Sequence, residues 1–198
     1  MYKRQGSGLS RLDSTLIFEG LSQGCTSTAA FLSIHNMATW MIDSFGSQEL
    51  KERFVPDLCS MKKISSYCLT EPGAGSDAGG LRTKAEKSGD HYILNGSKMW
   101  ISNSPAADIA VVWAKDETGE IRGFLVEKDF KGFSAPEMKG KHSLKASVTS
   151  ELVFQDCKIP KNRLLPGVKG LRGPFSCLNN ARFGISWGAV GAAQACFY

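Results

Sequence analysis

The chain has 198 residues, a formal net charge of +5 and six cysteines. Its Lys and Arg residues are scattered among acidic residues rather than gathered into a stripe, which argues against a nucleic-acid-binding protein. The cysteines form no C-x-x-C pair and show no metal-ligand spacing, so we expect free thiols in a reducing compartment and no metal. The longest apolar segment is shorter than the roughly 20 residues that cross a bilayer, so no membrane contact is expected.

The first part of the sequence has the pattern of amphipathic helices. Apolar residues recur at intervals of three and four from Leu12 to about Leu58. Ser47 is placed to cap the last helix of this region, and Pro56 to close or bend it. The first five residues match nothing around them and are left out of the fold. A helical domain is therefore expected over residues 1–64.

The middle of the sequence has the pattern of β-strands. From Ser65 to about Leu165 the apolar period shortens to two, with turns rich in Gly, Asp and Lys. Asn95-Gly96 is the strongest short-range hairpin signal, so we expect a hairpin that turns there and brings Trp100 and Ser102 to one place. An antiparallel β domain is therefore expected over residues 65–166.

A second helical pattern begins near Phe175 and continues to the end of the chain. It carries Gly184, Gly188 and Gly191 at a spacing suited to close helix packing. A single amphipathic helix cannot bury its own apolar face, so its apolar residues need partners that the sequence does not supply. We therefore expect residues 167–198 to be the first helix of a further domain, and the chain to be a fragment of a longer protein.

Two motifs have the composition of a ligand site. In the first, proline and glycines enforce a loop whose backbone donors can turn toward an anion or a carbonyl-rich ring. The second follows about twenty residues later. Either motif alone is more often a turn or a core strand, but both in this order between two helical regions favour a flavin site. They are Tyr67-Cys68-Leu69-Thr70-Glu71-Pro72-Gly73-Ala74-Gly75-Ser76-Asp77 and Lys98-Met99-Trp100-Ile101-Ser102.

These motifs resemble those of the acyl-CoA dehydrogenase family, in which a helical domain, a β-barrel domain and a second helical domain follow in this order. The resemblance implies an α+β fold and FAD as the cofactor. Trp100 would cover one flavin face, and Ser102 would donate near flavin N5, where a donor favours the reduced, negatively charged ring. The implied cofactor-binding residues are Tyr67, Cys68, Leu69, Thr70, Glu71, Pro72, Gly73, Ala74, Gly75, Ser76, Trp100, Ile101 and Ser102.

The resemblance also implies a site for an acyl-CoA thioester. Ser76 would meet its pantetheine or phosphate portion, and Arg182 would contact the ligand together with the polar residue three positions earlier. For Arg182 the alternative is a helix arginine whose side chain lies over its neighbours. The implied substrate-binding residues are Thr26, Ser27, Ser76, Phe175, Leu178, Asn179 and Arg182.

The resemblance divides along the chain. Up to about Lys98 the sequence is most similar to isobutyryl-CoA members of the family, and from Trp100 onward to glutaryl-CoA members. Glutaryl-CoA members carry an arginine that pairs with the distal carboxylate of the substrate, and here the matching position is Thr26. A buried unpaired charge costs about 3–5 kcal/mol, so we expect a short neutral acyl chain unless another cation replaces the arginine.

The family reaction removes the α proton with a glutamate and passes the β hydride to the flavin, which an electron-transfer flavoprotein reoxidises. In short-chain members that glutamate lies in the C-terminal domain, beyond Tyr198, and Glu71 belongs to the flavin loop. No catalytic residue is therefore assigned, and the fragment alone is expected to be inactive. The family also implies a homotetramer when full length, in a mitochondrial matrix or bacterial cytoplasm.

Two alternatives stay open. Acyl-CoA oxidases and flavin-dependent hydroxylases share the scaffold and differ in whether the reduced flavin meets oxygen. A non-catalytic fragment that fills a partner's interface is the second alternative. Such a fragment would fold stably without FAD.

Overall fold

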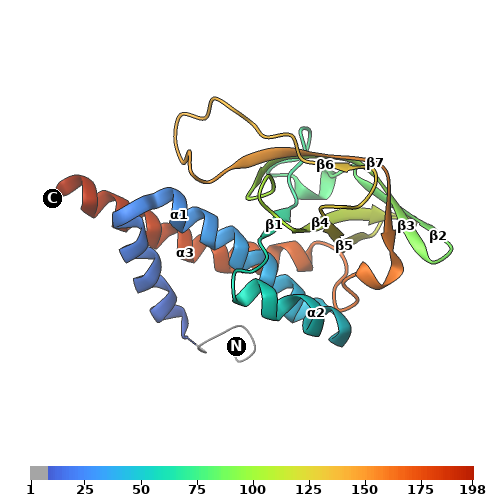
Figure 1. The fold of residues 1–198 in the computed structure, drawn as a ribbon, viewed down its shortest axis with the longest axis horizontal. Coiled ribbons are helices and arrows are strands. Elements are labelled where there is room, and N and C mark those ends of the chain that lie inside the picture. The colour runs from blue at the N-terminus through green and yellow to red at the C-terminus, as the bar shows by residue number, and fades with distance from the viewer. Residues whose placement is uncertain (1–8) are drawn as a thin grey trace.

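The computed structural model describes residues 9–198, in which helices pack against one curled β-sheet (Figure 1). The five residues left out of the predicted fold lie outside this range. The predicted order of helical, β and helical regions is confirmed. The elements are α1 (Arg11–Phe45), α2 (Gln48–Cys59), β1 (Ser65–Cys68), β2 (Lys84–Ser88), β3 (His91–Ser102), β4 (Ile109–Asp116), β5 (Ile121–Glu127), β6 (Phe133–Ser134), β7 (Thr149–Pro160) and α3 (Arg172–Phe197), with short 3-10 helices at Ala78–Gly80 and Lys161–Arg163.

The ends of the first two helices follow from local hydrogen bonding. Ser10 caps α1 in a reciprocal capping box with Asp13. Ser47 caps α2 as predicted, because its hydroxyl accepts from the Leu50 amide at 3.3 Å. Pro56 does not close α2, which continues to Cys59.

Helix α1 changes direction within its length, as the blue ribbon of Figure 1 shows. The backbone of Cys25 is not helical there, with φ −158° and ψ 103°. The residues before Cys25 therefore form one straight segment and those after it another. The second segment runs along the sheet.

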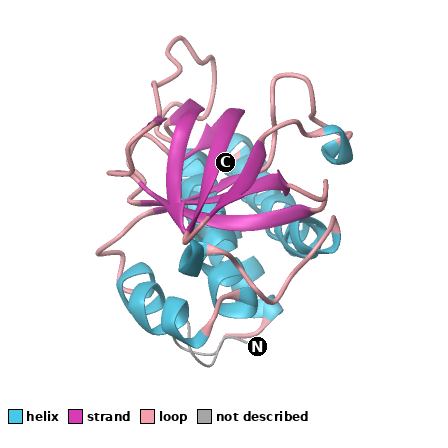
Figure 2. Cartoon of the chain, turned by 90° about the vertical axis from the view of Figure 1, so that its right-hand side faces the viewer, coloured by secondary structure: helices cyan, strands magenta, loops and turns pink. Residues whose placement is uncertain are grey.

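The sheet has seven strands and is mixed, so the prediction of an antiparallel domain is wrong in part. Strand β4 pairs in parallel with both β1 and β2, while the other pairings are antiparallel. Figure 2 shows the strands gathered above the helices. Short strands carry no sequence signal for direction, because direction depends on partners some 40 residues away, such as Ser65 and Ile109.

The predicted hairpin at Asn95-Gly96 is wrong. Strand β3 passes through both residues, and the chain turns instead between β2 and β3. Asn95 is bonded across to β7, where its Oδ1 accepts from the Asp156 amide at 2.8 Å beside a β-bulge. Gly96 has φ +142°, and a Cβ there would lie 2.7 Å from Oγ1 of Thr83, so this glycine permits a close approach rather than a turn.

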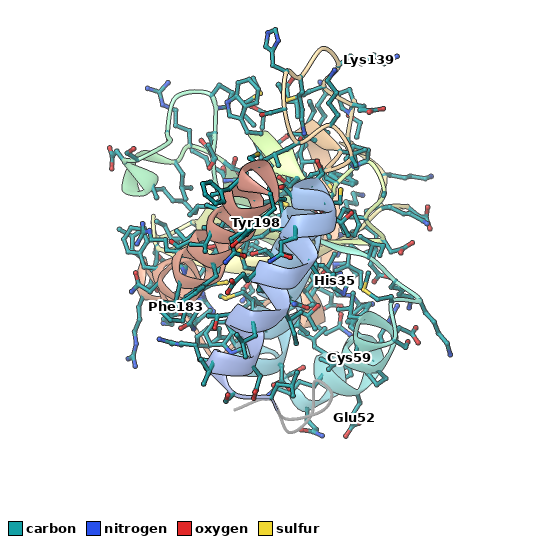
Figure 3. The ribbon with its side chains drawn as sticks, turned by 90° about the vertical axis from the view of Figure 1, so that its left-hand side faces the viewer. His35, Glu52, Cys59, Lys139, Phe183 and Tyr198 are labelled. Atoms are coloured by element: carbon teal, nitrogen blue, oxygen red, sulfur yellow. The ribbon has the colours of Figure 1, made fainter. Side chains whose placement is uncertain are left out.

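Helix α3 lies beside the first segment of α1 (Figure 3). The prediction that its glycines serve close packing is confirmed at Gly188 and Gly191. A Cβ on Gly188 would lie 3.0 Å from Oγ of Ser22, and one on Gly191 would overlap the carbonyl oxygen of Glu19. The opposite face of α3 is exposed, with Ile185 at 45% and Val190 at 42%.

Two buried apolar clusters hold the helices and the sheet together. One lies between the helices and the sheet and includes Met41, Phe54 and Trp113. The other lies inside the curl of the sheet and includes Val112 and Phe154. Successive residues of β4 alternate between the two clusters, which explains why Val111, Val112 and Trp113 are all buried.

Candidate functional site

Two cavities open where the second segment of α1, the start of α3 and the ends of β1 and β3 meet. Their volumes are about 270 Å³ and 580 Å³. They adjoin, because six side chains line both of them. The shared residues are Ile34, Met37, Trp100, Ser102, Leu178 and Arg182.

The smaller cavity brings the two predicted motifs together. The amide of Met99 donates to the carbonyl of Thr70 at 2.9 Å, so the loop after β1 is tied directly to the end of β3. The start of α3 closes the cavity from the other side. The residues singled out from the sequence that line it are Tyr67, Leu69, Thr70, Gly75, Ser76, Trp100, Ile101, Ser102, Phe175, Leu178 and Arg182.

Other residues of the first motif lie outside the two cavities. Cys68 is fully buried on the far face of β1, and burial raises the pKa of its thiol to about 12. Ala74 is also buried, in the cluster between helices and sheet. Pro72 and Gly73 are exposed at the tip of the loop.

Three predicted substrate residues also lie outside the cavities. Thr26 and Ser27 are half-buried on α1, about one turn before Ala30, which does line the larger cavity. The Thr26 hydroxyl donates to the Ser22 carbonyl at 3.3 Å. Asn179 is exposed and accepts a 3.0 Å hydrogen bond from Arg182, so its side chain holds the guanidinium that lines both cavities.

Trp100 stands in an unusual backbone conformation. Its φ is +61°, and the pairing of β3 with β7 slips by one residue between Lys98 and Ile101. Such a bulge changes the direction of a side chain. A positive φ at a large residue is unfavourable, so the surrounding contacts must stabilise this conformation. Trp100 is 63% exposed and lines both cavities.

The smaller cavity is lined by two hydroxyl groups that are available to a ligand. Thr70 and Ser102 both line it and are half-buried. Within the described part of the chain neither side chain has a hydrogen-bond partner. Hydroxyls in such a position can donate to, or accept from, a bound molecule.

A buried ion pair lies behind the Thr70 loop. Nζ of Lys98 is 2.8 Å from Oε1 of Glu71, and the side chains are 0% and 6% exposed. Burial raises the pKa of Glu71, but Lys98 and hydrogen bonds from Thr83 and Arg82 outweigh it and hold that pKa below its usual value. Burial also lowers the pKa of Lys98, opposed by the Glu71 charge. Glu71 therefore faces the interior and lines neither cavity.

Sequence reasoning missed the α1 wall and one loop. Ala30, Ser33, Ile34 and Met37 line the larger cavity at intervals of three and four, a helical spacing that could have marked them as one face. The loop between β6 and β7, at the top of Figure 1, forms another part of its wall. The cavity-lining residues of that loop are Lys141, His142, Ser143, Leu144 and Ser147.

The three histidines lie in a helix, a strand and a loop. His35 is buried, with Nδ1 accepting from the Ser65 amide at 3.1 Å and Nε2 2.9 Å from the Leu58 carbonyl oxygen, so it joins α1, α2 and β1. His91 begins β3. His142 is exposed in its loop.

The cavities are basic and apolar. Lys141, His142 and Arg182 are the basic groups on their walls, the Tyr67 phenol lines the smaller cavity, and no described lining residue carries a carboxylate. Across residues 9–198 no three His, Cys, Asp or Glu side chains gather closely enough to hold a metal ion. Over the same residues no helix combines the length and apolar character needed to cross a bilayer. All six cysteines are free.

Two family models match the chain. The acyl-CoA dehydrogenase N-terminal domain matches residues 3–62, and the acyl-CoA dehydrogenase middle domain matches residues 66–157. The chain belongs to the acyl-CoA dehydrogenase family, as the two motifs predicted. The predicted fold class is confirmed with it, apart from the strand directions described above.

Individual relatives agree with the family. The chain is 46% identical over 194 residues to mitochondrial isobutyryl-CoA dehydrogenase of Bos taurus, covering 96% of this chain and 47% of that protein. It superimposes on glutaryl-CoA dehydrogenase of Mycobacterium smegmatis in complex with FADH2 with a TM-score of 0.92 at 44% identity, covering 95% of this chain and 49% of the other. A solved structure described as electron transferring flavoprotein of Acidaminococcus fermentans also matches, with a TM-score of 0.92, 34% identity and coverage of 98% and 53%. The chain spans about half the length of these relatives.

Proposed function

We propose that the whole protein is an FAD-dependent dehydrogenase of a short-chain acyl-CoA. One observation carries this proposal: two motifs about twenty residues apart in sequence converge on one cavity in a chain that belongs to this family. The loop after β1 supplies Thr70 and Ser76, and β3 supplies Trp100 and Ser102. The relative from Mycobacterium smegmatis is described as a complex with FADH2, which supports the same cofactor here.

The residues on the smaller cavity fit a flavin ring. Trp100 offers an exposed aromatic face against which a planar ring can stack, and the Thr70 and Ser102 hydroxyls have no protein partner within the described residues. A bound FAD supplies the acceptor for the hydride. Ser102 would then donate to the ring, and Trp100 would exclude water from one of its faces.

The walls of the larger cavity favour a neutral acyl chain. Ala30, Ile34, Met37 and Leu178 form an apolar surface beside Trp100. Thr26 lies one turn earlier on α1, where the glutaryl-CoA members carry their arginine. We therefore place a short neutral chain, such as isobutyryl or butyryl, along this surface.

The basic groups at the rim suit the remainder of the substrate. Arg182, held by Asn179, and the Lys141 loop present positive charge to a ligand whose coenzyme portion carries phosphates. Nζ of Lys141 itself donates to the Ser147 carbonyl and, at 2.9 Å, to Oγ1 of Thr149, so this lysine holds the loop in place. We assign it no direct charge pairing with an acyl carboxylate.

The proton-abstracting base lies elsewhere in this proposal. No described cavity-lining residue carries a carboxylate, and the one acidic residue of the first motif, Glu71, is paired with Lys98. We place the base in the whole protein outside residues 9–198. An electron-transfer flavoprotein as acceptor, and a homotetramer, complete the proposal.

Flavin binding is the first test. We expect the chain to retain FAD with a visible absorption band and with quenching of tryptophan fluorescence. Trp100→Phe should lose much of that quenching and bind FAD more weakly, while Trp187→Phe, on the half-buried face of α3, should behave as the parent. A folded, monodisperse chain that is indifferent to FAD would contradict the flavin site.

Activity of the whole protein is the second test. With an artificial electron acceptor, isobutyryl-CoA or butyryl-CoA should be oxidised with a higher kcat/KM than glutaryl-CoA. Preference for glutaryl-CoA would overturn the neutral-chain proposal. Rapid reoxidation of the reduced protein by air would favour an acyl-CoA oxidase or a hydroxylase instead.

A further inference from the structure

The Lys98 side chain crosses from β3 to the loop that carries Thr70. Its Nζ donates to the Leu69 carbonyl at 3.1 Å and to Oε1 of Glu71 at 2.8 Å. Leu69 and Glu71 flank Thr70 on both sides. A single ammonium therefore fixes the backbone before Thr70 and the side chain after it.

Glu71 extends this connection to a third segment. Its Oε1 accepts from the Thr83 amide at 2.9 Å and from the Thr83 hydroxyl at 2.6 Å, and its Oε2 accepts from the Arg82 amide at 2.6 Å. The Thr83 hydroxyl is also 3.3 Å from the Ser97 carbonyl oxygen. Both carboxylate oxygens are thus satisfied, so the pair is a complete polar network in the interior.

The network ends at the two residues that face the flavin cavity. Lys98 is the last residue in register before the bulge that gives Trp100 its positive φ, and Met99 inside the bulge donates to Thr70. The strand directly before the bulge is paired with β7 at Leu152 and is also held from the side of the loop. The contacts of Lys98 with Leu69 and Glu71 provide this second attachment.

We propose that Lys98 and Glu71 are positioning residues that set the relative placement of Trp100 and Thr70 and so fix the flavin-ring site. This inference rests on the proposed function, because it gives the pair a role toward a bound flavin. Neither residue touches the cavity, so both act through their neighbours. A buried pair that only stabilised the fold would not need to join the two segments that line one ligand site.

The decisive experiment compares stability with FAD affinity in four variants. Lys98→Met and Glu71→Gln each leave one buried charge without its counter-charge, and the double variant Lys98→Met/Glu71→Gln removes both charges. Lys63→Met is the matched control, because Lys63 pairs with Asp57 at 3.0 Å on the surface, with side chains 37% and 38% exposed. Circular dichroism and thermal unfolding report the fold, and flavin fluorescence titration well below the unfolding midpoint reports FAD affinity.

We expect each single variant to bind FAD about ten- to a hundredfold more weakly, by analogy with the loss of residues that orient metal ligands from behind. The double variant should recover thermal stability relative to the single variants, because it leaves no buried unpaired charge. Its FAD affinity should stay low, because the tie between β3 and the loop is still missing. The control should match the parent within about twofold.

Recovery of affinity together with stability in the double variant would overturn the inference, since that result describes a merely structural pair. If the charge variants do not fold, the FAD affinities of Thr83→Val and Thr83→Ser test the positioning role instead. Thr83→Val removes the hydroxyl on Glu71 and should weaken FAD binding several-fold, while Thr83→Ser should restore it. Equal affinity of Thr83→Val and the parent would reject the positioning role.

FAD binding by the parent protein distinguishes failure of the proposed function from failure of the positioning role. A folded parent that binds no FAD would refute the proposed function and this inference with it. A parent that binds FAD, with folded variants that bind it equally well, would refute the inference alone. The visible band of the bound flavin gives an independent readout, because displacement of Trp100 from the ring should shift it in the variants and not in Lys63→Met.

Discussion

The hydroxyl of Tyr67 donates to the carbonyl oxygen of Pro174 at 3.2 Å, which joins β1 to the first turn of α3. Burial raises the pKa of this phenol, so it remains a donor throughout the physiological range. Beside this contact the ring of Trp113 packs against Gly173. The start of α3, which closes the smaller cavity, is therefore fixed to the sheet by one hydrogen bond and one close backbone approach.

Gly173→Ala tests that approach. A Cβ there would lie 2.5 Å from Cη2 of Trp113 and 2.6 Å from Cγ2 of Val168, so the substitution overpacks a buried site. We expect it to lower the free energy of unfolding by about 1–3 kcal/mol. Gly20→Ala is the control: Gly20 lies on α1 with nothing within 4 Å of an added Cβ, and alanine there should stabilise by about 0.5–1 kcal/mol. Urea unfolding measures both, and equal effects would contradict the packing argument.

The sequence predicted those features that depend on neighbouring residues. The Ser47 cap and the helical period of α1 and α2 are local, and both are present. The hairpin at Asn95-Gly96 was predicted wrongly although it also looked local. There the contacts of Asn95 with Asp156 and of Gly96 with Thr83 override the turn preference, and both partners are distant in sequence.

In the candidate site, too, the features that depend on neighbouring residues could be predicted and those that depend on distant residues could not. The two motifs identified most of the smaller cavity, because their composition restricts the backbone within each motif. The partnership of Lys98 with Glu71 was not predicted, since the two residues are 27 apart. One signal did exist: Lys98 shares the inward-facing parity of Tyr92 and Leu94 on β3, and a lysine at such a position needs a buried partner.

His35 makes stability depend on pH. Its Nδ1 accepts from the Ser65 amide, which requires an uncharged ring, and burial lowers its pKa below the usual value. As pH falls, the unfolded chain binds a proton near pH 6.5 while the folded ring does not, so stability is complete above about pH 6.5 and is lost below it. The free energy of unfolding should fall by up to about 1.4 kcal/mol for each pH unit below this point.

Urea unfolding of the parent and His35→Gln between pH 7.5 and 5.5 measures this effect. The variant should be less stable at pH 7.5 and should lack most of the slope. His142→Gln is the control, because His142 is exposed, and it should keep the slope of the parent. Identical slopes in the parent and His35→Gln would show that another group is responsible.

The thiols should differ in reactivity. Burial raises the pKa of Cys68 and Cys177 to about 12 and of Cys157 to about 11, and all three are inaccessible. With N-ethylmaleimide at neutral pH the native chain should be modified only at the three exposed cysteines, and the denatured chain at all six. Mass spectrometry identifies the sites. Rapid native modification of Cys177 would mean that the start of α3 detaches from α1.

Among the exposed thiols Cys25 should react before Cys59. Hydrogen bonds from Thr28 lower the pKa of Cys25, whereas burial and the nearby Asp43 carboxylate raise that of Cys59. Reactivity follows the thiolate fraction, so the order reports these environments. Thr28→Val should slow the modification of Cys25 and leave the modification rate of Cys59 unchanged. An unchanged rate at Cys25 would rule out the hydrogen bond as the cause of its higher reactivity.

Gly191→Ala tests the packing of α3 against α1. An added Cβ would overlap the Glu19 carbonyl oxygen and lie 2.9 Å from its carbon, and a backbone group cannot move aside as a flexible side chain can. The helices would have to separate, which also breaks the 2.9 Å hydrogen bond from Gln194 to the Glu19 side chain. We expect a loss of about 1–3 kcal/mol in the free energy of unfolding and faster amide exchange along α3.

Gly184→Ala on the same helix is the matched control for that loss. A Cβ there would be 3.6 Å from the ring of Phe18, an ordinary van der Waals contact, so alanine should be neutral or stabilise by up to about 1 kcal/mol. The two variants make the same chemical change seven residues apart. Opposite signs in urea unfolding would tie the cost to the approach of Glu19, whereas losses of similar size would assign it to a general intolerance of α3 to substitution.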